Sequence, residues 1–124
     1  MKADPTDALA VLREVREHAG DGALPFGYYI GDGAGGMHTI SFVLSSDSSR
    51  DLCVGYWLRR LAAWTREIEG FFEFTAEYTV HAECGYGRGY TTLGCADPFA
   101  ALAALILALP ADVARGVFAR KDGE

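Results

Sequence analysis

The chain has 124 residues, which suits a single domain over residues 1–124, and its formal net charge is −6. Half of the residues are apolar and 12% are aromatic, so a core can form without metals or disulfides. An acidic chain repels phosphate groups, which disfavours direct binding to nucleic acid, whereas it suits a protein partner with a basic surface. We expect flexibility only at residues 1–4 and 121–124.

Two features of the sequence bear on location. Residues 1–5 lack the apolar segment of a secretory signal, and the longest apolar run, residues 99–109, is too short to cross a bilayer. The three cysteines are an odd number at unrelated spacings, unlike a disulfide framework. We therefore expect a cytoplasmic protein that does not contact the membrane.

The first third of the chain predicts a helix and a hairpin. Asp4 and Pro5 are typical of a helix start, because Asp caps free N–H groups and Pro suits the first helical position. Apolar residues then recur at helical spacing until a glycine, which predicts a helix over residues 5–19. Residues 26–30 and 39–45 each alternate apolar and polar side chains around a glycine-rich link, which predicts two antiparallel strands.

A second helix is predicted to follow the serine-rich turn at residues 45–49 and to end at Gly70. Its apolar stripe has spacings of three and four residues and comprises Val54, Trp57, Leu61, Trp64 and Ile68. The two tryptophans suit either a ring-lined ligand site or packing against a sheet. Because large aromatic side chains dominate ordinary cores, we expect packing.

Residues 71–84 show a long alternation of apolar and polar side chains. The apolar series is Phe72, Phe74, Ala76, Tyr78, Val80, Ala82 and Cys84, and the other series is polar after Phe71. Because side chains on a strand alternate between its two faces, we interpret this segment as one long strand with its apolar face on a core. We expect Phe74, Tyr78 and Val80 to be buried together with the stripe of the second helix.

The last third of the chain predicts a strand and two helices. Residues 90–93 predict a fourth strand, which returns beside the third after a glycine-rich turn. Asp97 and Pro98 repeat the helix-start pattern, and the helix over residues 98–109 is apolar on every side. Such a helix is either deeply buried or shared with another subunit, so we predict a homodimer that hides this helix or an edge of the sheet. A last short helix is predicted over residues 111–120.

The order of these elements defines the expected fold class. It runs helix, strand, strand, helix, strand, strand, helix, and the short links within each strand pair require antiparallel neighbours. Each strand has one apolar face. We therefore predict an α+β fold: an open-faced two-layer sandwich with a four-stranded antiparallel sheet and the helices packed on one face.

The sequence offers few residues for catalysis or metal binding. His81 and Glu83 form a His-x-Glu pattern, which zinc deaminases combine with Pro-Cys-x-x-Cys, but here Cys95 stands alone. A metal ion held by His81, Glu83 and Glu77 lacks the three or four converging ligands that such sites need, because these three residues follow one strand. We find no enzyme signature and expect no metal and no cofactor.

The charge pattern points to a surface for binding. Residues 67–84 hold five acidic side chains and no Lys or Arg, whereas Arg59, Arg60 and Arg66 gather on the second helix. A surface of one sign steers a partner of the opposite sign. The predicted binding surface, which we call the acidic ladder, consists of Glu73, Thr75, Glu77, Thr79, His81 and Glu83, with Tyr86 and Arg88 at its rim.

These observations favour a non-catalytic acidic protein that binds or inhibits another macromolecule. The final third, with its strand, glycine-rich turn, Asp-Pro pair and Ala/Leu helix, resembles the ending of many small phage- and mobile-element-encoded bacterial proteins. The resemblance implies a small interaction protein such as an inhibitor, an immunity protein or a chaperone. The alternative is a small enzyme or ligand-binding or metal-binding domain that uses His81 and Glu83 beside Tyr78 or Cys95.

Overall fold

The computed structural model describes residues 2–4, 6–25, 47–83, 89–92, 94–95 and 97–119. The helices are α1 (Ala8–Ala19), η1 (Asp21–Ala23), α3 (Asp47–Glu67), α4 (Pro98–Ala108) and α5 (Ala111–Val117). The strands are β1 (Phe71–Phe74), β2 (Val80–Glu83) and β3 (Gly89–Thr92), and they form an antiparallel sheet in the order β1-β2-β3. The strands predicted over residues 26–30 and 39–45 lie outside the described residues.

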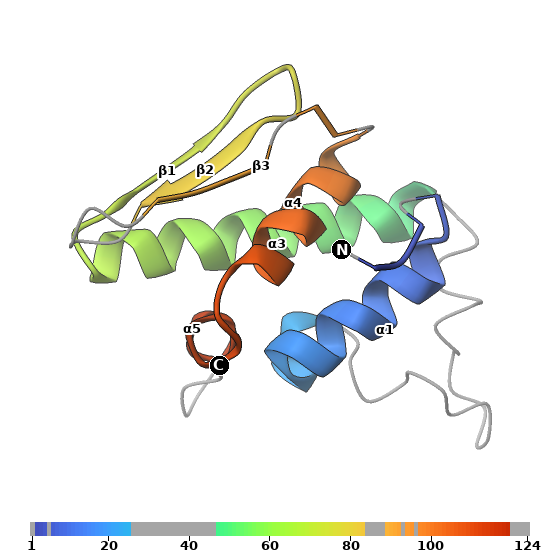
Figure 1. Cartoon of the computed structure of the whole chain (residues 1–124), viewed down its shortest axis with the longest axis horizontal. Helices are drawn as coiled ribbons and strands as arrows, with labels where there is room; N and C mark the ends of the chain where they lie inside the picture. Colours follow the sequence, from blue (N-terminus) through green and yellow to red (C-terminus); the bar gives the residue numbers. More distant parts are fainter. Residues whose placement is uncertain are drawn as a thin grey trace.

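All of the described helices lie on one side of the sheet (Figure 1). The sheet rests on α3 and α4, and α1 and α5 pack beneath those two helices. The α+β class and the antiparallel sheet packed against helices are thus confirmed. The other face of the sheet is not covered by any described element (Figure 1).

The interpretation of residues 71–84 as one long strand is wrong. Residues 75–79 form a turn that folds β2 back against β1. The Thr75 N–H donates to the Thr79 carbonyl at 2.9 Å, and the Tyr78 N–H donates to the Thr75 carbonyl at 3.0 Å. Tyr78 has a φ of 55°, which is a left-handed conformation that Gly or Asn usually adopts in such turns. The half-buried Tyr78 side chain packs against the core, and this contact helps to hold the strained backbone.

The alternation of faces nevertheless survives the turn. Across β1 and β2, Phe72 pairs with Ala82 and Phe74 pairs with Val80 on the inner face, whereas Glu73 pairs with His81 and Phe71 pairs with Glu83 on the opposite face. The inner face contains the fully buried Val80 and Ala82, with Tyr90 of β3 packed against the same core. We call the opposite surface the outer sheet face; it consists of Phe71, Glu73, His81, Glu83 and Thr91.

The core beneath the sheet is built around α3 and α4. Trp57 is fully buried, stacks on Phe99 with ring centroids 5.3 Å apart, and donates from Nε1 to the Ala23 carbonyl at 2.7 Å. Leu61 is also fully buried, which confirms the expected packing role of this stripe, although Trp64 is only half-buried. Of the three strand residues expected in this core, Val80 is fully buried while Phe74 and Tyr78 are half-buried and pack against it.

Helix α4 is buried within this one chain. Seven of its residues are buried: Phe99, Ala100, Ala101, Leu102, Ala103, Leu105 and Ile106. The helix contacts α1, α3 and the sheet, which explains its apolar character on every side. The homodimer therefore stays a prediction that rests on the sheet edges and no longer on this helix. Within the described part of the chain, no helix combines the length and the apolarity that a membrane span requires.

Candidate functional site

The structure gathers only part of the acidic ladder on one surface. Glu73, His81 and Glu83 share the outer sheet face, because Glu73 is the cross-strand partner of His81 and Glu83 is the partner of Phe71. Neighbours of this kind have Cβ atoms about 4.5–5.5 Å apart. The hairpin therefore turns a predicted line of side chains into a cluster. Tyr86 and Arg88 lie outside the described residues.

The other three ladder residues belong to the hairpin turn. The Thr75 hydroxyl oxygen accepts from the N–H groups of Glu77 and Thr79, both at 3.3 Å. Thr75 and Thr79 are half-buried, whereas Glu77 is exposed in the turn. The prediction that these residues extend a strand surface is wrong, because the segment reverses direction at Thr75. The two threonines instead take part in the hydrogen bonds that shape the turn.

His81 is held in place from two sides. Its Nδ1 atom forms a hydrogen bond with the Thr91 hydroxyl on β3, and its Nε2 atom lies 3.5 Å from a carboxylate oxygen of Glu83. The ring also covers Gly89, because a Cβ atom at that position would lie 2.8 Å from His81 Cε1. A residue with a side chain at position 89 would displace the imidazole. The ring is thus fixed by β3 on the outer sheet face.

Phe71 is the exposed aromatic residue of this face. Its side chain is 48% exposed, and its ring centroid lies 5.1 Å from that of His81 with a tilt of 36°. Glu83 lies directly across from it, and Glu73 lies two positions along the same strand face. The outer sheet face therefore presents a half-exposed aromatic ring flanked by two carboxylates.

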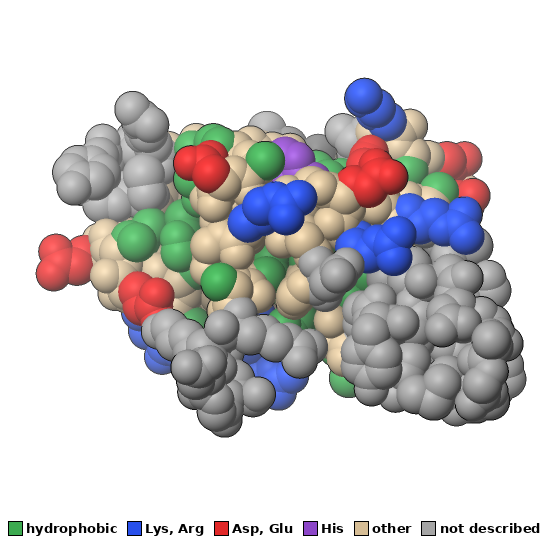
Figure 2. All heavy atoms as spheres, turned by 90° about the horizontal axis from the view of Figure 1, so that it is seen from below, with side chains coloured by type: hydrophobic (Ala, Val, Ile, Leu, Met, Phe, Trp, Pro, Cys, Tyr) green, Lys and Arg blue, Asp and Glu red, His purple; other side chains and the backbone are tan. Residues whose placement is uncertain are grey.

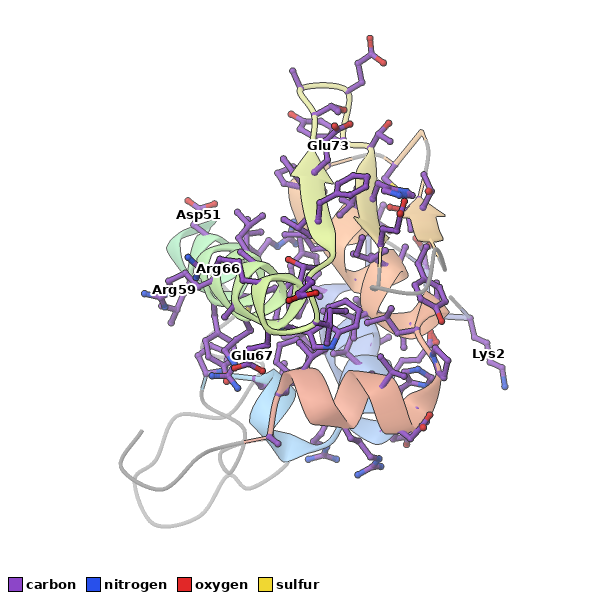
Figure 3. All side chains as sticks on the ribbon, turned by 90° about the vertical axis from the view of Figure 1, so that its left-hand side faces the viewer. Lys2, Asp51, Arg59, Arg66, Glu67 and Glu73 are labelled. Atoms are coloured by element: carbon purple, nitrogen blue, oxygen red, sulfur yellow. The ribbon has the colours of Figure 1, made fainter. Side chains whose placement is uncertain are left out.

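Charge is distributed unevenly over the molecule. Residues 67–83 contain no Lys or Arg, so the described β1–β2 hairpin carries only negative formal charge. In contrast, Arg59 and Arg66 are exposed on α3, where Asp51 also projects into solvent, and all three are well separated from Glu73 on the sheet (Figure 3). Figure 2 shows the face formed below by α1 and α5, where acidic and basic side chains alternate. Acidic side chains thus occur on the helices as well, but in the β1–β2 hairpin they occur without basic ones.

Two hollows lined by described residues lie away from the outer sheet face. One of about 380 Å³ is lined by Lys2, Glu14, Glu17, His18 and Leu107. Glu14 accepts there from the N–H groups of Lys2 and Ala3, and His18 Nε2 donates to the Leu109 carbonyl at 2.6 Å. The other, of about 120 Å³, is lined by Arg60, Ala63, Trp64, Glu67, Gly116, Val117 and Ala119. Neither of them includes His81.

Of the residues proposed for an enzyme, Glu83 lies beside His81, whereas Tyr78 and Cys95 pack against the core. Tyr78 packs against the core, on the side opposite to the imidazole. Burial raises the pKa of the Cys53 thiol to about 12, which keeps it a neutral thiol at physiological pH. Cys95 is half-buried and packs against the core, and Cys84 lies outside the described residues. Among the described residues, no three His, Cys, Asp or Glu side chains come together in a way that suits a metal ion.

Two members of the outer sheet face, Phe71 and Thr91, were not among the predicted site residues. Phe71 carried a signal in the sequence, because its position in the alternation placed an aromatic side chain in the polar series. Thr91 had only the parity of a short strand to indicate its face. Its pairing with His81 depends on the register between β2 and β3.

Comparisons with known proteins found no match of any kind. No family model matches the chain, and no curated protein and no solved structure is significantly similar to it. The arguments for function therefore rest on the geometry and charge of the outer sheet face.

Proposed function

We propose that this chain is a non-catalytic acidic interaction protein that binds another protein through its outer sheet face. The observation that carries the proposal is the half-exposed Phe71 beside two carboxylates, on a hairpin without Lys or Arg. A partner with a basic surface fits this face, because opposite charges accelerate association and fix orientation. An inhibitor, an immunity protein or a chaperone, such as those of phages and mobile elements, fits this physical profile.

The rigidity of this face supports a role in binding. The Thr91 hydroxyl and the space above Gly89 hold the His81 ring, and the ring lies against Phe71. A preorganised surface loses less conformational entropy when it binds.

The test is a pull-down from cells of the source organism with three immobilised proteins. These are the wild type, the Glu73→Lys/Glu83→Lys variant, and the Asp51→Lys/Asp112→Lys variant, which has the same change in net charge on α3 and α5. We expect the wild type and Asp51→Lys/Asp112→Lys to retain the same partner protein. Glu73→Lys/Glu83→Lys should not retain it. A partner that is retained equally by all three folded proteins would contradict the proposal. Circular dichroism shows whether each variant is folded.

One observation favours a second candidate, a small enzyme or ligand-binding domain. His81 lies between the Thr91 hydroxyl and the Glu83 carboxylate, an order of groups found where a base activates a hydroxyl nucleophile. This function predicts hydrolysis of activated esters that is lost in a folded His81→Gln variant. Equal rates for wild type and variant would remove this candidate.

A further inference from the structure

We propose that the outer sheet face binds an arginine side chain of the partner protein, with the guanidinium stacked on Phe71 and paired with Glu73 and Glu83. This inference rests on the proposed function and specifies the chemical group that the surface recognises. Three properties of the face carry it: an accessible aromatic ring, two glutamates at neighbouring positions of the same face, and a His81 ring that is held in place beside Phe71.

The aromatic ring is accessible and already has one neighbour at its side. Phe71 is 48% exposed although its His81 neighbour is only 5.1 Å away between centroids. A guanidinium is planar and more weakly hydrated than an ammonium, so it stacks on aromatic faces at a lower cost of desolvation. An aliphatic partner side chain would use the ring but would offer no donor to Glu73 or Glu83.

Both carboxylates belong to residues that neighbour Phe71 on the outer sheet face. Glu83 is the cross-strand partner of Phe71, and Glu73 is two residues away on the same face of β1. Arginine has five N–H donors in a rigid fork, which can serve carboxylates in two directions at once. Lysine offers a compact charge that cannot stack in the same way.

Strand β3 holds the His81 ring in place beside Phe71. His81 cannot move toward β3, because Gly89 already lies beneath its ring and Thr91 holds Nδ1. Residues 67–83 have no Lys or Arg, so the β1–β2 hairpin has no fixed positive charge of its own. An arginine of the partner protein would supply a positive charge to this face.

The test uses blocked peptides with the sequence Gly-X-Gly-X-Gly, in which X is arginine, lysine or citrulline. Binding to the isotope-labelled full-length protein is measured by chemical-shift titration at low salt. We expect arginine to bind about fivefold more tightly than lysine, the effect of one exposed cation–π contact. Citrulline keeps the shape but lacks the charge, and we expect no measurable binding.

Variants separate the ring from the charges. Phe71→Leu keeps an apolar side chain without an aromatic face and should remove the preference for arginine over lysine. Glu73→Gln/Glu83→Gln should weaken both cationic peptides and reduce their dependence on salt. Asp51→Asn/Asp112→Asn, the matched neutral control, should leave both affinities unchanged.

Three outcomes of the peptide titration would overturn the inference. They are equal affinity of the wild type for arginine and lysine peptides, a preference that persists in Phe71→Leu, and shift changes that map to α3 or α1 in place of the sheet. If the pull-down partner is lost in Glu73→Lys/Glu83→Lys but binds Phe71→Leu normally, the proposed function stands and the arginine site fails.

Discussion

Two segments of the chain have nearly the same sequence yet begin their helices differently. Ala-Asp-Pro-Thr-Asp-Ala-Leu-Ala starts at residue 3, and Ala-Asp-Pro-Phe-Ala-Ala-Leu-Ala starts at residue 96. In the second segment, Asp97 is the N-cap of α4 and accepts from the Ala100 N–H at 2.7 Å. In the first, the N-cap of α1 is Asp7, which accepts from the Ala10 N–H at 3.1 Å. The prediction that Asp4 caps the first helix was therefore wrong.

The segments differ at two positions, and the choice of cap follows from the second of them. Asp7 corresponds to Ala100, and an Asp at that place offers a second cap three residues further on. Asp4 is left to bond Thr6, whose N–H and hydroxyl donate to its carboxylate at 2.9 and 2.8 Å. Asp7 is exposed, whereas Ala100 is only 2% exposed. The comparison teaches that an aspartate three residues further on takes over the cap at a position that is exposed to solvent.

The largest expected effect comes from placing the aspartate of the first segment into the second. Ala100→Asp would bury a carboxylate without a partner, which costs at least about 3 kcal/mol of unfolding free energy. An acidic residue in the first turn normally stabilises a helix by about 0.3–1 kcal/mol, so burial outweighs the dipole. Urea unfolding measures the loss, and Ala100→Asn, which adds no charge, should lose less. An unchanged midpoint for Ala100→Asp would mean that the start of α4 is open to water.

An intermediate effect comes from removing each cap. Asp97→Ala should lower the free energy of unfolding by about 1–2 kcal/mol, and Asp7→Ala should lower it by about 0.5 kcal/mol. The difference is expected because Asp97 is half-buried and Asp7 is exposed. Thermal unfolding of both variants beside Asp97→Asn, which retains a capping side chain, measures the difference. Equal losses for Asp7→Ala and Asp97→Ala would show that exposure does not set the strength of the cap.

The smallest expected effect concerns Asp4, which no longer caps a helix. The N–H of Thr6, and then its hydroxyl, lower the pKa of the Asp4 carboxyl below its ordinary value of 3.8. Because folding lowers this pKa, the ionised Asp4 carboxylate stabilises the folded chain. This stabilisation is fully present above the pKa of Asp4 in the unfolded chain, and it is lost as the pH falls through the pKa of Asp4 in the folded chain. The stability difference between wild type and Asp4→Asn should therefore shrink below pH 3.8. A carboxyl titration by NMR that finds an ordinary pKa for Asp4 would contradict this prediction. Thr6→Val removes the hydroxyl but keeps the N–H, so it should return the pKa of Asp4 only part of the way to its ordinary value.

Much of the fold was predictable because burial imposes periodicity. The apolar stripe with Trp57 and Leu61, the Asp97 cap and the buried character of α4 all follow from local patterns that the structure retains. The hairpin at residues 75–79 was missed because its turn lacks Gly, Asn and Pro and places Tyr78 in the left-handed position. The end of α3 shows the same effect: Glu69 has a φ of 57°, while the glycine stands one position later.

For the candidate site, the sequence predicted which side chains share one face of the sheet but not how close together they lie. Because Phe74 and Val80 are six positions apart, the five-residue turn preserves the alternation, and Glu73, His81 and Glu83 keep the face that a continuous strand would have given them. Their mutual distances were not predictable, since a straight strand separates Glu73 from Glu83 by about 33 Å. The contact between His81 and Thr91 depends on a register that local residues do not determine.

The connection between α1 and α5 has a consequence for synthesis of the chain. Arg115 donates to the Glu17 carbonyl from a position 98 residues later, and α1 also packs against α4. At the usual rates of translation, α1 leaves the ribosome roughly 5–20 s before these partners exist. Its buried residues Val11, Leu12 and Val15 therefore remain uncovered by α4 and α5 during that interval. A nascent chain arrested before α4 should accordingly bind a general chaperone that releases the full-length protein.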